Sequence, residues 1–305
     1  MTEYDYDVIV VGTGPGGEGA AMKACKGGKK VAIIEKYKEV GGGCTHWGTI
    51  PSKALRQAVQ RVIQFNRNRW FKEACGGPLN LTFPQLLSSA TDVIKKQVNM
   101  RSGFYERNNL DLIYGTASFL DDNTMQIEAT SGGEKREITA EYFVLAPGSH
   151  PYRPADVDFN HPHIFDSDTI LNLDFTPRSI TIYGAGVIGS EYASIFQGLG
   201  VKVNLINTQQ VLLAFLDDEI VNALSHDMRE QGVVIRSNEE YESITGDGNA
   251  VVTQLVSGKK IKSDIFLWAN GRTGNFGDLA LDKISITPNS RGQINVNDNY
   301  QLEAK

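Results

Sequence analysis

The chain has 305 residues, of which 41% are hydrophobic, so it is long enough to bury a sizeable core, and its size favours two domains. Its formal net charge of −6 argues against a nucleic-acid-binding or anionic-membrane surface, because either needs a basic face. No apolar run approaches the ~18 residues of a membrane span, and the chain begins with a strand pattern rather than a signal region. We therefore predict a cytoplasmic protein with no nucleic-acid or membrane partner.

The first predicted unit consists of a strand, a glycine turn, a helix and a second strand. Residues 6–11 are apolar, Gly12, Gly14 and Gly17 follow with G-x-G-x-x-G spacing, and the second apolar run ends at Glu35. Such glycines allow a tight turn and a close approach of the backbone to a pyrophosphate at the helix N-terminus, and the terminal acid can accept hydrogen bonds from a ribose. Glycine turns also serve packing alone, but the complete context favours a dinucleotide site.

A glycine-rich loop, VGGGCTHWGT from Val40 to Thr49, precedes the next predicted helix. A dithiol enzyme of the C-x4-C type would need a cysteine at Thr49, because two sulfur atoms must approach to about 2 Å to form a disulfide. Cys44 therefore has no partner in the loop. The spacing of Cys25 and Cys75 indicates neither a disulfide framework nor a metal site, and we predict no bound metal.

After a further predicted helix at residues 84–107, the hydrophobic period changes to that of strands. Successive strands are predicted at residues 112–120, 124–130, 135–140 and 142–148. They predict a β-meander. The proline-rich, aperiodic stretch at residues 150–166 then marks a crossover between domains.

The opening pattern repeats after this crossover. Gly184, Gly186 and Gly189 stand between a strand and a helix, and the second strand of the repeat ends at Asn207. Two copies of one unit predict an α/β fold with two Rossmann-like dinucleotide-binding domains, the first of which carries the β-meander as an insertion.

The two predicted sites differ in the residue that ends the second strand. An NAD-selective site has a carboxylate there, which would repel the 2′-phosphate of NADP, whereas this chain has Asn207. Two like charges ~4 Å apart repel by roughly 4 kcal/mol at an effective dielectric of about 20, so the missing charge removes much of the discrimination. We expect the second site to accept both NAD and NADP. The alternative is a plain NAD site in which Asn207 is only a neutral strand-end residue.

Two nucleotide sites in one chain suggest a tightly held redox group in one and an exchanging nicotinamide in the other. The arrangement resembles the flavoprotein disulfide reductases, whose first unit binds FAD and whose second binds NAD(P)H. Three motifs carry the resemblance, which covers nearly the whole chain: GGGCTHWGTIPSKAL for the active-site loop and helix, FVLAPGSHP for the return strand and FLWANGRTGN for the nicotinamide-domain exit. It implies an FAD-binding domain at residues 1–150, an NAD(P)-binding domain at 151–274 and the start of a return segment at 275–305.

The resemblance also implies a function for the loop with one cysteine. With Thr49 in place of a second thiol, electrons that arrive at a non-covalently bound FAD find no protein disulfide to reduce, so they leave as hydride to another nicotinamide. We expect an enzyme that transfers hydride between NADPH and NAD. The alternatives are a diaphorase or NAD(P)H oxidase of the same fold, which passes electrons to a quinone or to oxygen, and a nucleotide-binding fragment without turnover.

The resemblance implies that Lys53 lies at the flavin N5 and pairs with Glu191 across the two domains. A buried cation needs a counter-ion, and a positive charge there stabilises a reduced, anionic flavin. Cys44 lies near the flavin ring by the same resemblance, but a single thiol has no evident redox task, and packing is the favoured interpretation. The expected catalytic residues are Lys53, Glu191 and Cys44. The expected cofactor-binding residues are Gly12, Gly14, Gly17, Glu35, Lys36, Gly42, Gly43, Cys44, Lys53, Gly115, Gly148, Gly184, Gly186, Gly189, Asn207 and Gly271.

The chain ends before two parts of the resembled family. One is the segment that contacts the ribityl chain and phosphates of the flavin, and the other is a C-terminal interface domain. We therefore expect a truncated chain whose parent uses NAD(H) and NADP(H) as substrates and forms a homo-oligomer through the missing domain.

Overall fold

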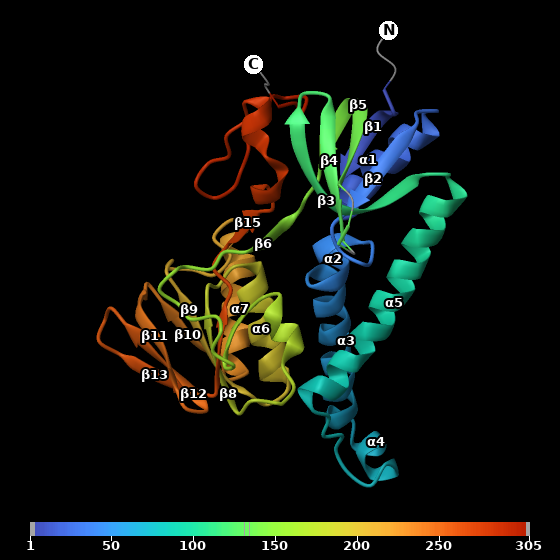
Figure 1. The fold of residues 1–305 in the computed structure, drawn as a ribbon. Helices are drawn as coiled ribbons and strands as arrows, with labels where there is room; N and C mark the ends of the chain where they lie inside the picture. Colours follow the sequence, from blue (N-terminus) through green and yellow to red (C-terminus); the bar gives the residue numbers. More distant parts are fainter. Residues whose placement is uncertain (1–3, 131, 134, 303–305) are drawn as a thin grey trace. The chain divides into compact units, whose positions relative to one another are not determined.

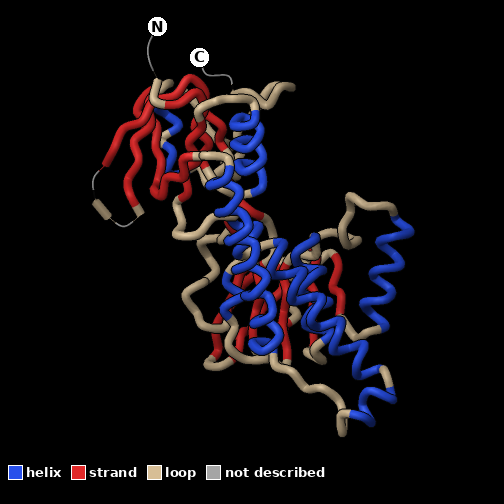
Figure 2. The backbone as a smooth tube through the Cα atoms, turned by 90° about the vertical axis from the view of Figure 1, so that its right-hand side faces the viewer, coloured by secondary structure: helices blue, strands red, loops and turns tan. Residues whose placement is uncertain are grey.

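The computed structural model describes residues 4–130, 132–133 and 135–302. Packing divides the chain into two compact units: unit 1 comprises the described residues of 1–46, 94–150 and 272–305, and unit 2 comprises residues 47–93 and 151–271. Both ends of the described chain therefore belong to unit 1 (Figure 2). The domains predicted from the sequence were defined by the cofactor that each one binds, whereas these units are defined by packing. The assignment of FAD and NAD(P) to domains therefore stays a prediction.

The main sheet of unit 1 is closed (Figure 1). Its strands, in spatial order, are β1 (Tyr6–Val11), β2 (Val31–Glu35), β3 (Asp111–Asp121), β4 (Thr124–Ala129) and β5 (Lys135–Leu145). β1 pairs in parallel with both β2 and β5, and β2 pairs in parallel with β3. The consecutive strands β3, β4 and β5 are antiparallel, so the predicted meander is confirmed.

The strand β5 differs from the sequence pattern, which predicts separate strands at residues 135–140 and 142–148. The first part of β5 pairs with β4, from Lys135 to Thr139, and the second part pairs with β1, from Ala140 to Leu145. Because each half has its own neighbour, one continuous strand closes the sheet.

Both faces of β1 are covered, because successive side chains of a strand point to opposite sides. One set packs with α1 (Pro15–Lys26) and with the end of α5 (Phe83–Arg107), a long helix that begins in unit 2 and ends in unit 1. The other set packs inside the closed sheet with the short 3-10 helices η2 (Gly277–Leu279) and η3 (Leu281–Ile284). This packing fixes the end of β1, where the first glycine turn begins.

Unit 2 contains a five-stranded parallel sheet in the order β10-β9-β8-β14-β7 (Figure 1). The strands are β7 (Ile164–Asp166), β8 (Ser179–Tyr183), β9 (Lys202–Asn207), β10 (Val234–Ser237) and β14 (Ile265–Trp268). All four residues of β14 are buried, as expected for a parallel strand that is covered on both faces.

Helices and a second sheet complete unit 2. The helices are α3 (Thr49–Arg67), α4 (Arg69–Ala74), η1 (Thr169–Asn172), α6 (Val187–Gly198) and α7 (Asp218–Glu230). The strands β11 (Tyr241–Asp247), β12 (Ala250–Leu255) and β13 (Lys260–Ser263) form an antiparallel sheet. The predicted α/β fold with two Rossmann-like units is thus confirmed.

Two short strands, β6 (Ser149–Pro151) and β15 (Arg272–Gly274), pair with each other where the chain leaves unit 1 and where it returns. Within the described ranges, no helix combines the length and the apolar character that a membrane crossing requires.

Candidate functional site

The first glycine turn lies between β1 and α1, as predicted. Gly12 has a φ angle of +99°, which favours glycine, and a Cβ atom on Gly17 would overlap the carbonyl oxygen of Gly12. The turn itself therefore requires these two glycines. Gly14, the N-cap of α1, is different, because a Cβ atom there would meet no atom within 4 Å. The space beside Gly14 is open at a helix N-terminus, which suits an incoming phosphate.

The helix α2 (Gly42–His46) lies against this turn. Gly42 has a φ angle of +60°, and a Cβ atom on it would approach the Cα atom of Gly14 to 2.8 Å. Gly43 and Cys44 follow in α2, where Cys44 is half-buried and forms no disulfide. Thr49 begins α3. The predicted loop therefore places the start of α2, the helix that carries Cys44, against the glycine turn, and the interpretation of Cys44 as a packing residue stays a prediction.

Glu35 ends β2 and is only 4% exposed. Its carboxylate accepts hydrogen bonds from the backbone N–H of Thr13 (3.2 Å), from the Thr13 hydroxyl and from the backbone N–H of Tyr37 (2.9 Å). The Thr13 hydroxyl in turn accepts a bond from the N–H of Gly41 (2.9 Å). Glu35 thus joins the end of β2 to the glycine turn and to the following loop. Its role toward a ribose stays a prediction.

The other residues predicted for unit 1 have varied surroundings. Lys36 forms an ion pair with Asp278 of η2 at the surface. Gly115 is explained by strand packing, because a Cβ atom there would approach a side chain of β4 to 2.6 Å. Gly148 precedes β6 with a φ angle of +75°. Each of these residues thus has a feature that the structure of unit 1 explains without a cofactor. Their contacts with a cofactor stay predictions.

The second glycine turn repeats the geometry of the first. Gly184 has a φ angle of +104°, and a Cβ atom on Gly189 would overlap the carbonyl oxygen of Gly184. Gly186, the N-cap of α6, has open space around its Cα, as Gly14 does. Gly271, which precedes β15, has a φ angle of +101° and equally open surroundings. The two turns are therefore equivalent in backbone as well as in sequence.

Asn207 ends β9 and is 5% exposed. Its Nδ2 donates to the carbonyl oxygen of Val211 (2.8 Å), and its Oδ1 accepts from the backbone N–H of Gln209 (3.3 Å). Both polar atoms therefore hold the loop that follows the strand. The predicted use of NAD and NADP rests on the missing charge at this position, and it stays a prediction.

The predicted ion pair between Lys53 and Glu191 is present. The Nζ atom of Lys53 lies 2.8 Å from each carboxylate oxygen of Glu191, and the Ser52 hydroxyl lies 3.4 Å from one of them. The Lys53 side chain is 57% exposed and that of Glu191 is 16% exposed. The prediction placed the pair across two domains. In the structure both residues belong to unit 2, because α3 packs against α6.

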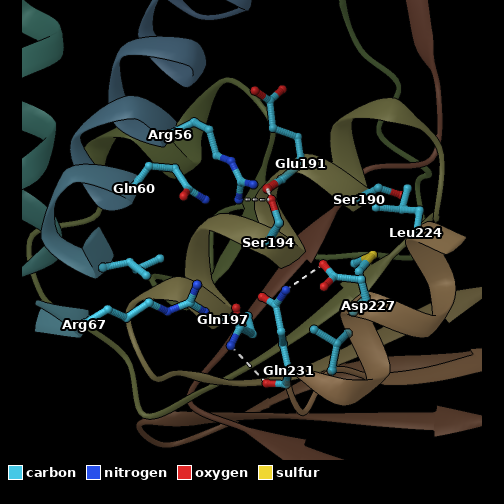
Figure 3. A pocket seen from close by; sticks show the side chains of 13 residues that line it. Arg56, Gln60, Arg67, Ser190, Glu191, Ser194, Gln197, Leu224, Asp227 and Gln231 are labelled. Carbon is cyan, nitrogen blue, oxygen red and sulfur yellow. Dashed lines mark hydrogen bonds between the residues drawn. The ribbon is translucent and has the colours of Figure 1, made fainter. Parts of the chain in front are cut away.

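A groove of about 370 Å³ lies beside this pair, between α3, α6 and α7 (Figure 3). Arg56 of α3 donates to the hydroxyl of Ser194 in α6 (2.6 Å) across it, and the Ser194 hydroxyl donates to the carbonyl oxygen of Glu191 (2.7 Å). Sequence analysis did not identify Arg56 or Ser194. Their positions, each three residues after a member of the ion pair, are the signal that would have found them.

A network of polar side chains that joins the first turn of α1 to α5 was also not predicted. Glu18, in the first turn of α1, pairs with Arg101 of α5 (3.1 Å) and accepts a hydrogen bond from the hydroxyl of Tyr105 (3.2 Å). Burial, with the nearby Glu18 carboxylate, raises the pKa of Tyr105 well above its usual range, so its hydroxyl remains a donor. These partners lie far apart in the sequence and have no local signal.

Two equivalent glycine turns, each at the end of a parallel strand and the start of a helix, define an α/β protein with two dinucleotide-binding units. The chain belongs to the pyridine nucleotide-disulphide oxidoreductase family, whose sequence profile matches residues 6–305.

Individual relatives agree with this assignment. The chain is 56% identical over 301 residues to the soluble pyridine nucleotide transhydrogenase of Pseudomonas aeruginosa (strain LESB58), and 54% identical over 301 residues to that of Chromohalobacter salexigens. Each alignment covers 99% of this chain but only 64% and 65%, respectively, of the relative. The chain therefore spans slightly less than two thirds of the length of these curated relatives.

Solved structures show the same fold. The Cu(II) complex of the HOCl-induced flavoprotein disulfide reductase RclA from Escherichia coli has a TM-score of 0.84 at 26% identity, over 100% of this chain and 65% of that one. LpdA from Mycobacterium tuberculosis has a TM-score of 0.88 at 21% identity, over 98% of this chain and 66% of that one.

Proposed function

We propose that this chain belongs to an FAD-dependent enzyme that transfers hydride between NADPH and NAD. The observation that carries the proposal is the free thiol of Cys44 with Thr49 at the position where a C-x4-C enzyme has its second cysteine. Relatives that are 54–56% identical are named soluble pyridine nucleotide transhydrogenase, which supports the proposal. Because the chain is shorter than these relatives, the proposed activity is that of a protein of their full length.

The first glycine turn is the proposed site of non-covalent FAD. Open space at Gly14 and the close approach of Gly42 form a backbone cradle that admits a pyrophosphate, and Glu35 lies at the strand end where a ribose would bind. When bound, FAD supplies the centre that accepts hydride from one nicotinamide and returns it to another. The second turn, at Gly184 to Gly189, is the proposed site of NAD and NADP.

Lys53, Glu191 and Cys44 are the residues proposed to serve the reaction. The ammonium of Lys53 supplies a positive charge toward the flavin, and Glu191 is its counter-ion, with both carboxylate oxygens 2.8 Å from Nζ. Cys44 contributes packing beside the glycine turn. We further propose a cytoplasmic location, for which the acidic composition and the word "soluble" in the relatives' name are the support, and a homo-oligomer for the full-length protein.

The test uses the full-length protein with NADPH as donor and an NAD analogue as acceptor. Initial rates should follow ping-pong kinetics, because the two nicotinamides use one exchangeable site in turn. Alkylation of thiols should leave the transfer intact, and oxidised glutathione and dihydrolipoamide should be inert. Cys44→Ser should retain the activity. Thr49→Cys should lower it in air, because a disulfide between Cys44 and the introduced thiol accepts two electrons from the reduced flavin in competition with NAD, and dissolved oxygen re-forms it. Turnover of a disulfide, a quinone or oxygen at a rate that matches nicotinamide exchange would contradict the proposal.

A further inference from the structure

The helices α3 and α6 are joined by polar contacts that repeat after three residues on each helix. Lys53 pairs with Glu191, and Arg56 contacts Ser194. Residues three apart lie on the same face of a helix, one turn above each other. The two contacts are therefore neighbours, and both connect the same two helices; Figure 3 shows the contact of Arg56 with Ser194.

The second contact reaches the first through the backbone. Arg56 Nη1 donates to the Ser194 hydroxyl at 2.6 Å, and that hydroxyl donates to the carbonyl oxygen of Glu191 at 2.7 Å. Arg56 and Ser194 are both half-buried, so water competes less for this contact than for the exposed ammonium of Lys53. The chain of two bonds thus leads from α3 to the backbone of the residue that holds Lys53.

The helices also approach closely one turn further along. A Cβ atom on Gly198 of α6 would come within 2.7 Å of Val59 Cγ1 and 2.9 Å of Ile63 Cδ1, both in α3. This apolar packing sets the distance between the helices, and the polar contacts add a directional constraint to it. An exposed ion pair alone contributes only about 0–1 kcal/mol. The ion pair is therefore a weak constraint on the position of Lys53, and the Arg56 contact adds a second one.

We propose that Arg56 and Ser194 are positioning residues, which hold α3 in register on α6 so that the Lys53 ammonium stays on Glu191. The planar guanidinium is suited to this task because it loses less freedom per hydrogen bond than a lysine ammonium does. The consequence for hydride transfer rests on the proposed function, in which Lys53 places its charge toward the flavin. The register itself is a property of this chain without any cofactor.

The experiment measures how fast Lys53 is acetylated by N-hydroxysuccinimidyl acetate in the 305-residue chain, by peptide mass spectrometry. The amine of Lys53 reacts only after it leaves Glu191 and loses a proton, and Lys95, which is exposed on α5, serves as the internal reference. Arg56→Ala and Ser194→Ala should each raise the Lys53 rate relative to Lys95 about two- to fivefold, which corresponds to loss of one exposed ion pair. Glu191→Gln sets the upper limit of the effect.

Three further variants separate positioning from general destabilisation. Arg56→Lys keeps a donor for Ser194 and should restore most of the protection, and Arg61→Ala, which removes an exposed arginine of α3, should leave it unchanged. Unchanged labelling in Arg56→Ala and Ser194→Ala, while Glu191→Gln labels faster, would overturn the proposal. So would equal protection in Arg56→Lys and Arg56→Met, because methionine keeps side-chain bulk without a donor and arginine would then act through volume.

The activity of the full-length protein provides a separate readout. Arg56→Ala should lower kcat for hydride transfer from NADPH while KM for NADPH stays unchanged, because the nicotinamide site at Gly184 to Gly189 is untouched. A rise in KM with unchanged kcat would contradict positioning of Lys53. Failure of the wild-type protein to transfer hydride would refute the proposed function, but it would leave the labelling result intact.

Discussion

Asp166 is a fully buried carboxylate that organises the chain between β7 and η1. It accepts hydrogen bonds from the backbone N–H groups of Asp168 (2.9 Å) and Thr169 (2.8 Å), and from the guanidinium of Arg153 (2.7 and 2.6 Å). Burial raises the pKa of the Asp166 carboxyl, but the N–H of Thr169 and the charge of Arg153 outweigh burial and hold the pKa below its usual range. The carboxylate therefore stabilises the folded state in its charged form.

Asp166→Asn should lower the free energy of unfolding by about 2–4 kcal/mol. The NH2 group of the asparagine would face N–H groups that now donate to the carboxylate, and Arg153 would lose its counter-ion. Urea unfolding at neutral pH measures the loss. Because the folded pKa lies below the unfolded value near 3.9, the contribution of Asp166 is fully present above about pH 4 and is lost as the pH falls through the folded pKa. The wild-type protein should thus lose more stability below pH 4 than the variant does.

Asp122→Asn is the matched control, since this aspartate is exposed on the turn between β3 and β4. It should change stability little. Equal effects of the two substitutions would show that the bonds of Asp166 contribute nothing beyond a surface charge.

At the scale of elements, a buried arginine of α5, Arg101, forms an ion pair with Glu18 of α1. Arg101 is 8% exposed, pairs with Glu18 at 3.1 Å and donates to the Gln97 side chain at 2.6 Å. The Tyr105 hydroxyl supplies a further donor to Glu18. The three side chains hold the end of α5 on the first turn of α1, which follows the glycine turn.

Arg101→Ala should lower the free energy of unfolding by about 2–4 kcal/mol, because it leaves the Glu18 carboxylate largely buried without its cation. Unfolding is followed by circular dichroism in urea rather than in guanidinium chloride, because that salt would screen the ion pair. The double variant Arg101→Ala/Glu18→Ala should lose less than the sum of the single variants, since the second change removes the unpaired charge. Additive losses would mean that the pair is not coupled, and Lys96→Ala on the exposed face of α5 controls for helix propensity.

Local signals predicted the elements that repeat and missed those that depend on distant partners. Each of the two repeated units consists of a strand, a turn, a helix and a second strand. Both units were predicted, because apolar runs and glycine spacing are local signals. The continuous β5 was not, because its two halves pair with β4 and β1. The site residues divide in the same way: Gly12 and Gly184 have turn geometry that their motif predicts, whereas the partners Arg56 and Ser194 meet only through packing of α3 on α6.

At the scale of the whole molecule, the packing units interleave along the chain. The predicted boundary near residue 150 coincides with a passage between units, in a proline-rich stretch whose strands, β6 and β7, have only three residues each. Residues 47–93 pack with unit 2 although they lie within the first predicted domain. No composition shift marks that change, since it results from apolar contacts such as that of Val59 with α6.

The duplication makes a matched test of the cofactor assignment possible. Gly14 and Gly186 are both N-caps with φ angles of −64° and −75°, which any residue adopts, and a Cβ atom at either meets nothing within 4 Å. The Cβ atom of a side chain at either position is therefore accommodated by the fold, so that Gly14→Val and Gly186→Val should lower the melting temperature modestly and to a similar extent, through the loss of a favourable N-cap residue. Each valine also occupies the space through which a pyrophosphate approaches the backbone.

Gly14→Val should reduce FAD bound by the full-length protein, measured from its visible absorbance after reconstitution, at least about tenfold, while NADP binding measured by calorimetry persists. A tenfold loss corresponds to only about 1.4 kcal/mol, less than the contacts that an excluded pyrophosphate forfeits. Gly186→Val should do the reverse. Loss of nicotinamide binding in Gly14→Val with flavin retained would exchange the two assignments, and loss of both ligands in either variant would show that the two units do not bind independently.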